Sequence, residues 1–171
     1  MGNNPIVQFI LQPILIFGVL FHFVMGFVLE LQNSKSRSTS YSVYKGKTNA
    51  SWMSRNMILS GIVILSFLGL HFYDFWVPEM NYKYVQVLPL DQNRYFEELV
   101  HKFESPVRVM IYAFSFIFLS LHLLHGFASS FQSVGLNNKY TKSIKSFTTA
   151  FSIIVPIGFV FIAVFHHINK F

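Results

Sequence analysis

The 171-residue chain is too apolar to form an ordinary soluble domain. It is 53% hydrophobic and 12% charged, whereas soluble domains carry about 25% charged residues. Cysteine is absent, which excludes disulfides, iron–sulfur clusters and thiolate zinc sites held by this chain. The net charge of +6 does not indicate a nucleic-acid partner, because the basic residues cluster in short segments between apolar stretches, where they act as topology signals.

Four long apolar stretches predict four membrane-spanning helices. Their approximate ranges are 5–31, 54–77, 106–134 and 147–168. Each exceeds the roughly 20 residues that a helix needs to cross a hydrocarbon core of about 30 Å, and backbone polar groups in lipid must be satisfied within the segment. The sequence therefore predicts an all-α transmembrane helical bundle, a single membrane domain over residues 1–171 with an outer loop at 78–105.

The charges of the loops orient these helices. The segments 32–53 and 135–146 carry basic residues and no acids, whereas the segment 78–105 holds five of the seven acidic residues. By the positive-inside rule, the first and third loops are cytoplasmic and both termini lie outside. An external N-terminus this short is unusual without a signal sequence. We therefore expect a further helix upstream of Met1, with a complete four-helix protein as the alternative.

Histidines are concentrated in the predicted spans, where ionisable residues are costly and are candidates for function. His22 and His125 each lie about nine residues, or about 14 Å, from the predicted cytoplasmic end of their helix. Two histidines at one depth can coordinate one haem iron from opposite sides, because bonds of about 2 Å place their nitrogens about 4 Å apart. His71 lies about 25 Å from the cytoplasmic start of its helix. It implies a second site, with a partner from elsewhere.

The other histidines have simpler interpretations. His122 lies one turn before His125 and is placed to hydrogen-bond a neighbouring helix. His166 and His167 lie in the last turn of the fourth helix, where snorkelling to the interface is expected. His101 lies in the outer loop, and we expect it to be solvated.

Small residues accompany the candidate ligands. Gly18 and Gly26 are each four residues from His22, while Gly69 and Gly126 lie close to His71 and His125 along the chain. Glycine leaves room for a porphyrin plane, although it also allows close packing of membrane helices.

Two arginines are candidates for pairing with haem propionates. Arg55 lies at the cytoplasmic start of the second helix, and Arg108 lies at the outer start of the third. Arginine suits bidentate pairing with carboxylates. Both residues fit equally well as interfacial anchors.

Three segments resemble the single-chain, dihaem cytochrome b subunit of succinate dehydrogenases and fumarate reductases: IFGVLFHFVMGFVLEL, SWMSRNMILSGIVILSFLGLHFYDFW and LHLLHGFASSFQSVGLNNKY. The likeness covers nearly the whole chain and is greatest to the form found in Bacteroidetes. Its most specific piece is the His-Gly pair at 125–126 with the Ser/Gly-rich helix end that follows.

In that family, five helices hold two haems b stacked across the membrane. The resemblance implies that His22 and His125 ligate the cytoplasmic-side haem, and that His71 ligates the outer haem with a partner on the family's first helix. Because that helix has no counterpart among the four predicted spans, we expect one haem b in this chain.

The resemblance also implies a function. A flavoprotein subunit would oxidise succinate, an iron–sulfur subunit would pass the electrons to this anchor, and the haems would relay them to menaquinone. The chain would be an electron-transfer subunit, non-catalytic for succinate itself, in the bacterial cytoplasmic membrane as a multi-pass protein.

Two alternatives stay open. One is a cytochrome b subunit of a hydrogenase, a formate dehydrogenase or a nitrate reductase, which the co-purifying subunits would distinguish. The other is a haem-free membrane anchor or small transporter, which a reduced haem spectrum would exclude. Transport has little support, because no predicted span carries an acidic residue near its centre; Asp74 lies near the outer end of its helix.

Overall fold

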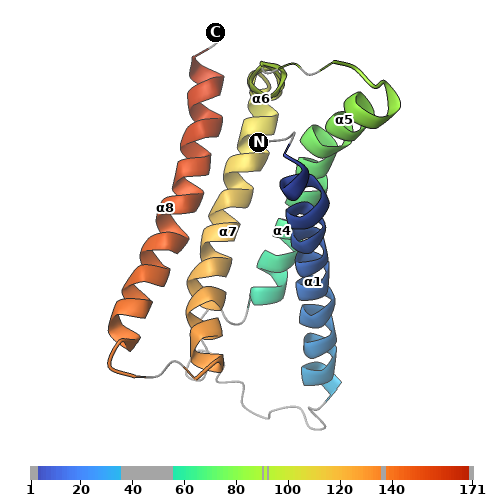
Figure 1. Cartoon of the computed structure of the whole chain (residues 1–171). Coiled ribbons are helices and arrows are strands. Elements are labelled where there is room, and N and C mark those ends of the chain that lie inside the picture. Colours follow the sequence, from blue (N-terminus) through green and yellow to red (C-terminus); the bar gives the residue numbers. More distant parts are fainter. Residues whose placement is uncertain (1–3, 36–55, 90, 92, 136–137, 170–171) are drawn as a thin grey trace. The chain divides into compact units, whose positions relative to one another are not determined.

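The computed structural model describes residues 4–35, 56–89, 91, 93–135 and 138–169, and the regular structure within them is entirely helical (Figure 1). Four helices there are long and apolar enough to cross a membrane: Val7–Lys35, Met57–Val85, Pro106–Ser133 and Thr141–Ile168. The prediction of an all-α fold with four transmembrane helices is confirmed, and the chain is a multi-pass membrane protein. The chain divides into two compact units, Met1–Ile58 and Leu59–Phe171.

Among its described residues, 4–35 and 56–58, the first unit contains one long helix. A π-helical stretch, η1 (Val7–Leu11), continues into α1 (Gln12–Lys35), and none of the α1 residues is buried. A helix that is apolar on all sides is typical of a membrane span. The helix ends at Lys35, beyond the boundary predicted at Leu31. Gln32, Asn33 and Ser34 are polar, so the apolar stretch alone did not include them in the predicted span.

The second span changes its helical pitch three times. It begins as α4 (Met57–His71), continues as the π-helical η2 (Phe72–Trp76), α5 (Val77–Met80) and the π-helical η3 (Asn81–Val85), and so extends beyond the predicted end at Val77. Pro78 explains the first change. It has no N–H for the carbonyl group of Asp74, and its ring would clash with that carbonyl in a regular α-helix. A wider π turn relieves the clash, and such turns are frequent at functional sites.

The core of the second unit is formed by α7 (Pro106–Ser133) and α8 (Thr141–Ile168), which lie side by side (Figure 1). Ser105 caps the start of α7 by accepting a hydrogen bond from the Arg108 N–H, and Pro106 follows at the first helical position. Gly135, with φ of 80°, follows the end of α7 and donates its N–H to the Gln132 carbonyl. This left-handed conformation is the usual reason for glycine after a helix.

The buried residues of the second unit come mainly from α7 and the elements around it. The core residues are Phe67, Phe103, Val109, Tyr112, Phe116 and Ala163. Edge-to-face contacts join Phe67 to Tyr112 and Phe116, at ring-centroid distances of 5.0 and 5.1 Å, and Phe116 stacks on Phe159 of α8 at 5.2 Å. These contacts place α4, α7 and α8 in one aromatic core.

The segment predicted as the outer loop is largely helical. Besides α5 and η3 it contains α6 (Arg94–Phe103), which is seen end-on beside the first turns of α7 in Figure 1. Phe103 of α6 is buried, whereas Glu97 and His101 are exposed. An amphipathic helix outside the spans is suited to the membrane–water interface. We call this end of the second unit the α6 end, and the opposite end, where Thr141 begins α8, the basic end.

Candidate functional site

His71, the last residue of α4, has an exposed ring bordered by aromatic side chains. Its ring centroid lies 5.9 Å from that of Phe67, 5.2 Å from that of Phe75 and 6.3 Å from that of Tyr112. Within the described residues, no hydrogen bond involves its ring nitrogens. The side chain therefore combines an available nitrogen with apolar flat surfaces, as an axial ligand of a porphyrin requires.

His22 and His125 lie on different units, His22 in α1 and His125 in α7. Counted from the helix ends, His125 lies eight residues, about 12 Å, before Ser133, whereas His22 lies 13 residues, about 20 Å, before Lys35. The equal depths inferred from the sequence refer to the ends of the apolar stretches, and the helix ends do not test them. The joint coordination of one iron by the two histidines stays a prediction.

His122 is held by a neighbouring helix, as its position suggested. Its Nδ1 lies 2.9 Å from the Ser60 hydroxyl of α4, and a hydrogen bond joins the two atoms. Its Cε1 also lies 3.9 Å from where a Cβ would stand on Gly61. This confirms the interpretation of His122 as a bridge between helices.

The two histidines at the end of α8 are not fully exposed but contact α6, and their snorkelling to the membrane interface stays a prediction. His167 Nδ1 is hydrogen-bonded to the backbone carbonyl of Phe103 at 2.9 Å. The His166 ring packs edge-on against Phe96 of α6 at 5.6 Å. Helix α6 covers this end of α8, so both rings are half-buried. His101, by contrast, is exposed as expected, with Glu104 3.4 Å away.

Open space lies beside three of the glycines. A Cβ on Gly18, Gly26 or Gly69 would meet no described heavy atom within 4 Å. Gly18 and Gly26 belong to the first unit, in a helix with no buried residue, and Gly69 belongs to the second. Both interpretations of these glycines, room for a porphyrin and close helix packing, therefore stay open.

A buried ionic cluster joins the second span to α6 and α7. The Asp74 carboxylate, 0% exposed, accepts hydrogen bonds from the Arg108 guanidinium and from the Tyr112 hydroxyl, the latter at 3.0 Å. The ammonium group of Lys102 lies 3.8 Å from it. We call these four residues the Asp74 cluster. Removing a carboxylate from water is costly unless cations and hydrogen bonds compensate for it, and the cluster supplies both.

This cluster bears on Arg108, one of the two arginines predicted to pair with haem propionates. The sequence offered Arg108 as a partner of a haem propionate, whereas its guanidinium binds Asp74. Sequence reasoning noted Asp74 and Arg108 separately and did not pair them. The signal was present: both stand near the outer ends of consecutive spans, and an acid in a membrane helix calls for a cation nearby. Arg55 lies outside the described residues.

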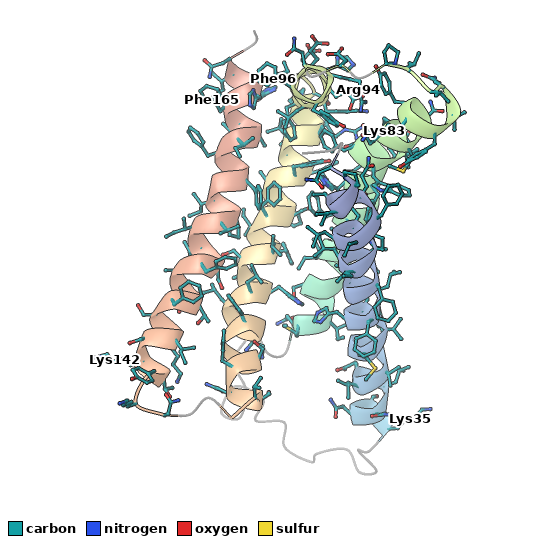
Figure 2. The ribbon with its side chains drawn as sticks, viewed as in Figure 1. Lys35, Lys83, Arg94, Phe96, Lys142 and Phe165 are labelled. Atoms are coloured by element: carbon teal, nitrogen blue, oxygen red, sulfur yellow. The ribbon has the colours of Figure 1, made fainter. Side chains whose placement is uncertain are left out.

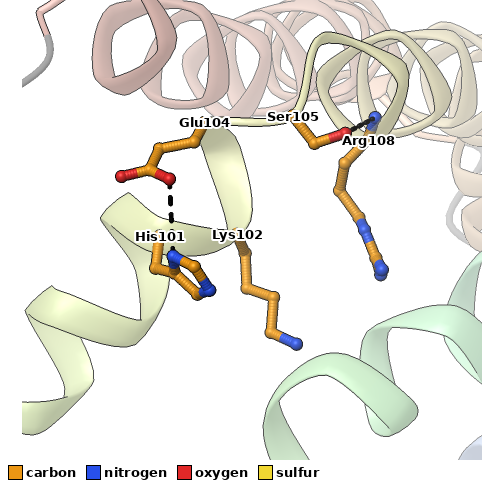
Figure 3. A pocket seen from close by; sticks show the side chains of 5 residues that line it. All are labelled: His101, Lys102, Glu104, Ser105 and Arg108. Atoms are coloured by element: carbon orange, nitrogen blue, oxygen red, sulfur yellow. Dashed lines mark hydrogen bonds and ion pairs between the residues drawn. The ribbon is translucent and has the colours of Figure 1, made fainter.

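A cavity of about 430 Å³ opens beside the Asp74 cluster, at the junction of α6 and α7. Its lining residues are His101, Lys102, Glu104, Ser105 and Arg108. Figure 3 shows the side chains of Lys102 and Arg108 extending in the same direction, while Glu104 turns away from them toward His101. The cavity thus has a cationic side and an anionic side.

A second ionic network lies at the α6 end. The Arg94 guanidinium binds the carboxylates of Glu79 and Glu98 and stacks over Tyr82, 4.1 Å from its ring centroid. Lys83, which lies near Arg94 in Figure 2, also pairs with Glu79. This Arg94 network ties α5 and η3 to the start of α6.

Comparisons with protein-family models, curated proteins and solved structures give no match to this chain. Within the described residues, no group of three or more histidine, aspartate or glutamate side chains is arranged to hold a metal ion. An iron with two axial histidines needs only two such side chains, so the histidine pairs remain the sites to test.

Proposed function

We propose that this chain is the haem b-binding membrane anchor of a succinate:menaquinone oxidoreductase in a bacterial cytoplasmic membrane. The observation that carries the proposal is the placement of His22, His71 and His125 inside three helices that are long and apolar enough to span a membrane. The resemblance of the surrounding segments to dihaem cytochrome b subunits gives these histidines their assigned role.

Each histidine would hold the iron of haem b through a ring nitrogen. His22 and His125 would form the cytoplasmic-side site, and His71 would contribute to an outer site. When bound, haem b supplies one-electron redox chemistry. The chain's own part is to orient the imidazoles, to keep water away with apolar side chains and to offer flat surfaces, which Phe67, Phe75 and Tyr112 provide around His71.

The propionates of the cofactor would need cationic partners near a membrane boundary. Arg108 is already paired with the fully buried Asp74, so the proposal keeps Arg55 as the candidate for this role. The other partners in the proposal are the flavoprotein subunit, the iron–sulfur subunit, menaquinone as the substrate, and the surrounding lipid.

The experiment compares electron donors in isolated membranes that contain this chain and its native partner subunits. Succinate should produce a reduced-minus-oxidised difference spectrum of b-type haem, and a menaquinone analogue should reverse it. Hydrogen and formate serve as matched donors. Reduction by hydrogen or formate, without reduction by succinate, would instead assign the chain to another oxidoreductase.

Purification through a tag on this chain gives a second readout. The complex should retain a flavin-bearing and an iron–sulfur subunit, since the chain has no cysteine with which to hold a cluster. Purified protein without b-type absorbance after dithionite reduction would support the haem-free anchor.

A further inference from the structure

The cavity at the junction of α6 and α7 carries charge of both signs. Lys102 and Arg108 share the single carboxylate of Asp74. Lys102 is the more weakly bound of the two, because its ammonium lies 3.8 Å from that carboxylate, while Arg108 bonds to it directly. The Lys102 ammonium, whose side chain is 27% exposed, therefore retains the capacity to bind a second anion.

The other side of the cavity is acidic. The Glu104 side chain is 57% exposed, and its only ionic contact within the described residues is the 3.4 Å approach to His101. A carboxylate can accept several hydrogen bonds, so Glu104 retains the capacity to bind an additional cation. Ser105, between the two sides, adds a hydroxyl group that can donate a hydrogen bond.

The cavity lies where lipid headgroups are expected. It opens beside the first turn of α7, which is a membrane span, and beside α6, which is amphipathic and lies outside the spans. Phe96 of α6 is exposed, as are Val107 and Met110 in the first turns of α7. Exposed apolar side chains next to a charged cavity are typical of the boundary between hydrocarbon and water.

We propose that this cavity binds the zwitterionic headgroup of a phospholipid that carries a primary ammonium, that is, a phosphoethanolamine group. Lys102 and Ser105 bind the phosphate, with Arg108 contributing positive potential while it remains paired with Asp74. Glu104 binds the ammonium. A primary ammonium donates hydrogen bonds to a carboxylate, whereas the quaternary ammonium of a choline headgroup has no N–H to donate. The site therefore selects ethanolamine over choline lipids.

The test uses the full chain in detergent and native mass spectrometry to count retained lipids during titration with phosphatidylethanolamine or phosphatidylcholine. The wild-type chain should bind one phosphatidylethanolamine about fivefold more tightly than phosphatidylcholine, the size expected for one additional charge-assisted contact at an interface. Equal affinity for the two lipids would overturn the proposal.

Two variants separate the two sides of the cavity. Lys102→Gln should weaken the binding of both lipids about fivefold, because it removes the phosphate contact. Glu104→Gln should remove the preference for ethanolamine and weaken the binding of phosphatidylcholine less, because the choline ammonium loses a charge contact but no hydrogen bond. Glu104 is exposed and lies outside the Asp74 cluster, so this variant stays informative even if Lys102→Gln impairs folding. An undiminished preference in Glu104→Gln would contradict the assignment.

A matched control and a competitor complete the design. Lys139→Gln removes one exposed lysine at the basic end and should leave both affinities unchanged, whereas a loss equal to that of Lys102→Gln would show binding by charge alone. Free phosphoethanolamine at millimolar concentration should not displace the lipid. Displacement would assign the cavity to a soluble phosphate ester and overturn the lipid assignment.

Discussion

The two ends of the second unit differ in whether their cationic side chains are paired with acidic ones. At the α6 end, cations lie against acids, in the Asp74 cluster and in the Arg94 network. At the basic end, the described stretch from 138 to 145 carries Lys139, Lys142 and Lys145 and no acid. Figure 2 shows Arg94 and Lys142 at these opposite ends. Net positive charge therefore remains at one end, and the positive-inside rule predicts that this end lies in the cytoplasm.

The polar contacts between helices differ in the same way. At the α6 end, a fully buried carboxylate binds charged partners on α6 and α7. Toward the basic end, α4 and α7 are joined by a hydrogen bond between neutral side chains, that of Ser60 with His122. Breaking a buried ion pair costs far more than losing one neutral hydrogen bond. We therefore expect the α6 end to dominate the stability of the unit.

The largest expected effect is the all-or-none labelling of the two ends in intact cells. Because the chain has no cysteine, Glu97→Cys on α6 and Lys142→Cys on α8 each provide a single thiol at an exposed position. An impermeant thiol reagent should label the variant at 97 in intact cells and the variant at 142 only after permeabilisation. The reverse pattern would invert the assignment of the ends.

Next in size is the cost of breaking the Asp74 cluster. Arg108→Ala should lower the free energy of unfolding by about 3–5 kcal/mol, because it leaves a buried carboxylate without its main cation. Thermal unfolding in detergent measures the loss. The matched control, Tyr112→Phe, removes one hydrogen bond and should cost about 1 kcal/mol or slightly more. The double variant Asp74→Asn/Arg108→Gln should recover part of the loss, and equal costs for the two single variants would contradict the comparison.

The Arg94 network should give an intermediate effect. Arg94→Ala removes two carboxylate contacts and the stacking on Tyr82, so we expect a loss of about 1–2 kcal/mol. Glu98→Gln keeps the shape of the side chain and loses one ion pair, and should cost about 0.5 kcal/mol. Proteolysis within 78–105 offers a second readout, which should quicken in Arg94→Ala alone.

Apart from the control variants, the smallest effect belongs to the hydrogen bond toward the basic end. Ser60→Ala should cost about 0.6 kcal/mol, the average of hydrogen bonds between helices in membranes. A double-mutant cycle with His122→Ala isolates this contact. A coupling energy above that of Asp74 with Arg108 would mean that the basic end, and not the α6 end, holds α4 against α7.

The sequence was sufficient for the class of fold and the number of spans, because lipid forces apolar stretches of this length into helices. It was less informative about helix ends. Polar residues can continue a helix beyond its apolar stretch, as Gln32 to Lys35 do. Pro78 does not end its helix, because the π turn before it accommodates the proline ring. The helix α6 was missed, although Tyr95, Leu99 and Phe103 recur at the spacing of one helical face.

Partners distant in the sequence were the harder part of the site. Asp74 and Arg108 are 34 residues apart, and no periodicity links them. Only the comparison of their depths in consecutive helices would have done so. The bridging role of His122 was predicted because one turn separates it from His125. The pairing of His22 with His125 stays a prediction, because the two residues belong to different units and only cofactor binding would test it.

The most direct test of the proposed haem site is therefore the haem content of two variants one helical turn apart on α7. His125→Ala should remove one haem's worth of b-type absorbance per chain after dithionite reduction, because the iron loses an axial ligand. His122→Ala should keep that absorbance, because the His122 ring is hydrogen-bonded to Ser60 of α4 and is not the proposed ligand. Loss of the absorbance in His122→Ala together with its retention in His125→Ala would contradict the assignment of the ligand.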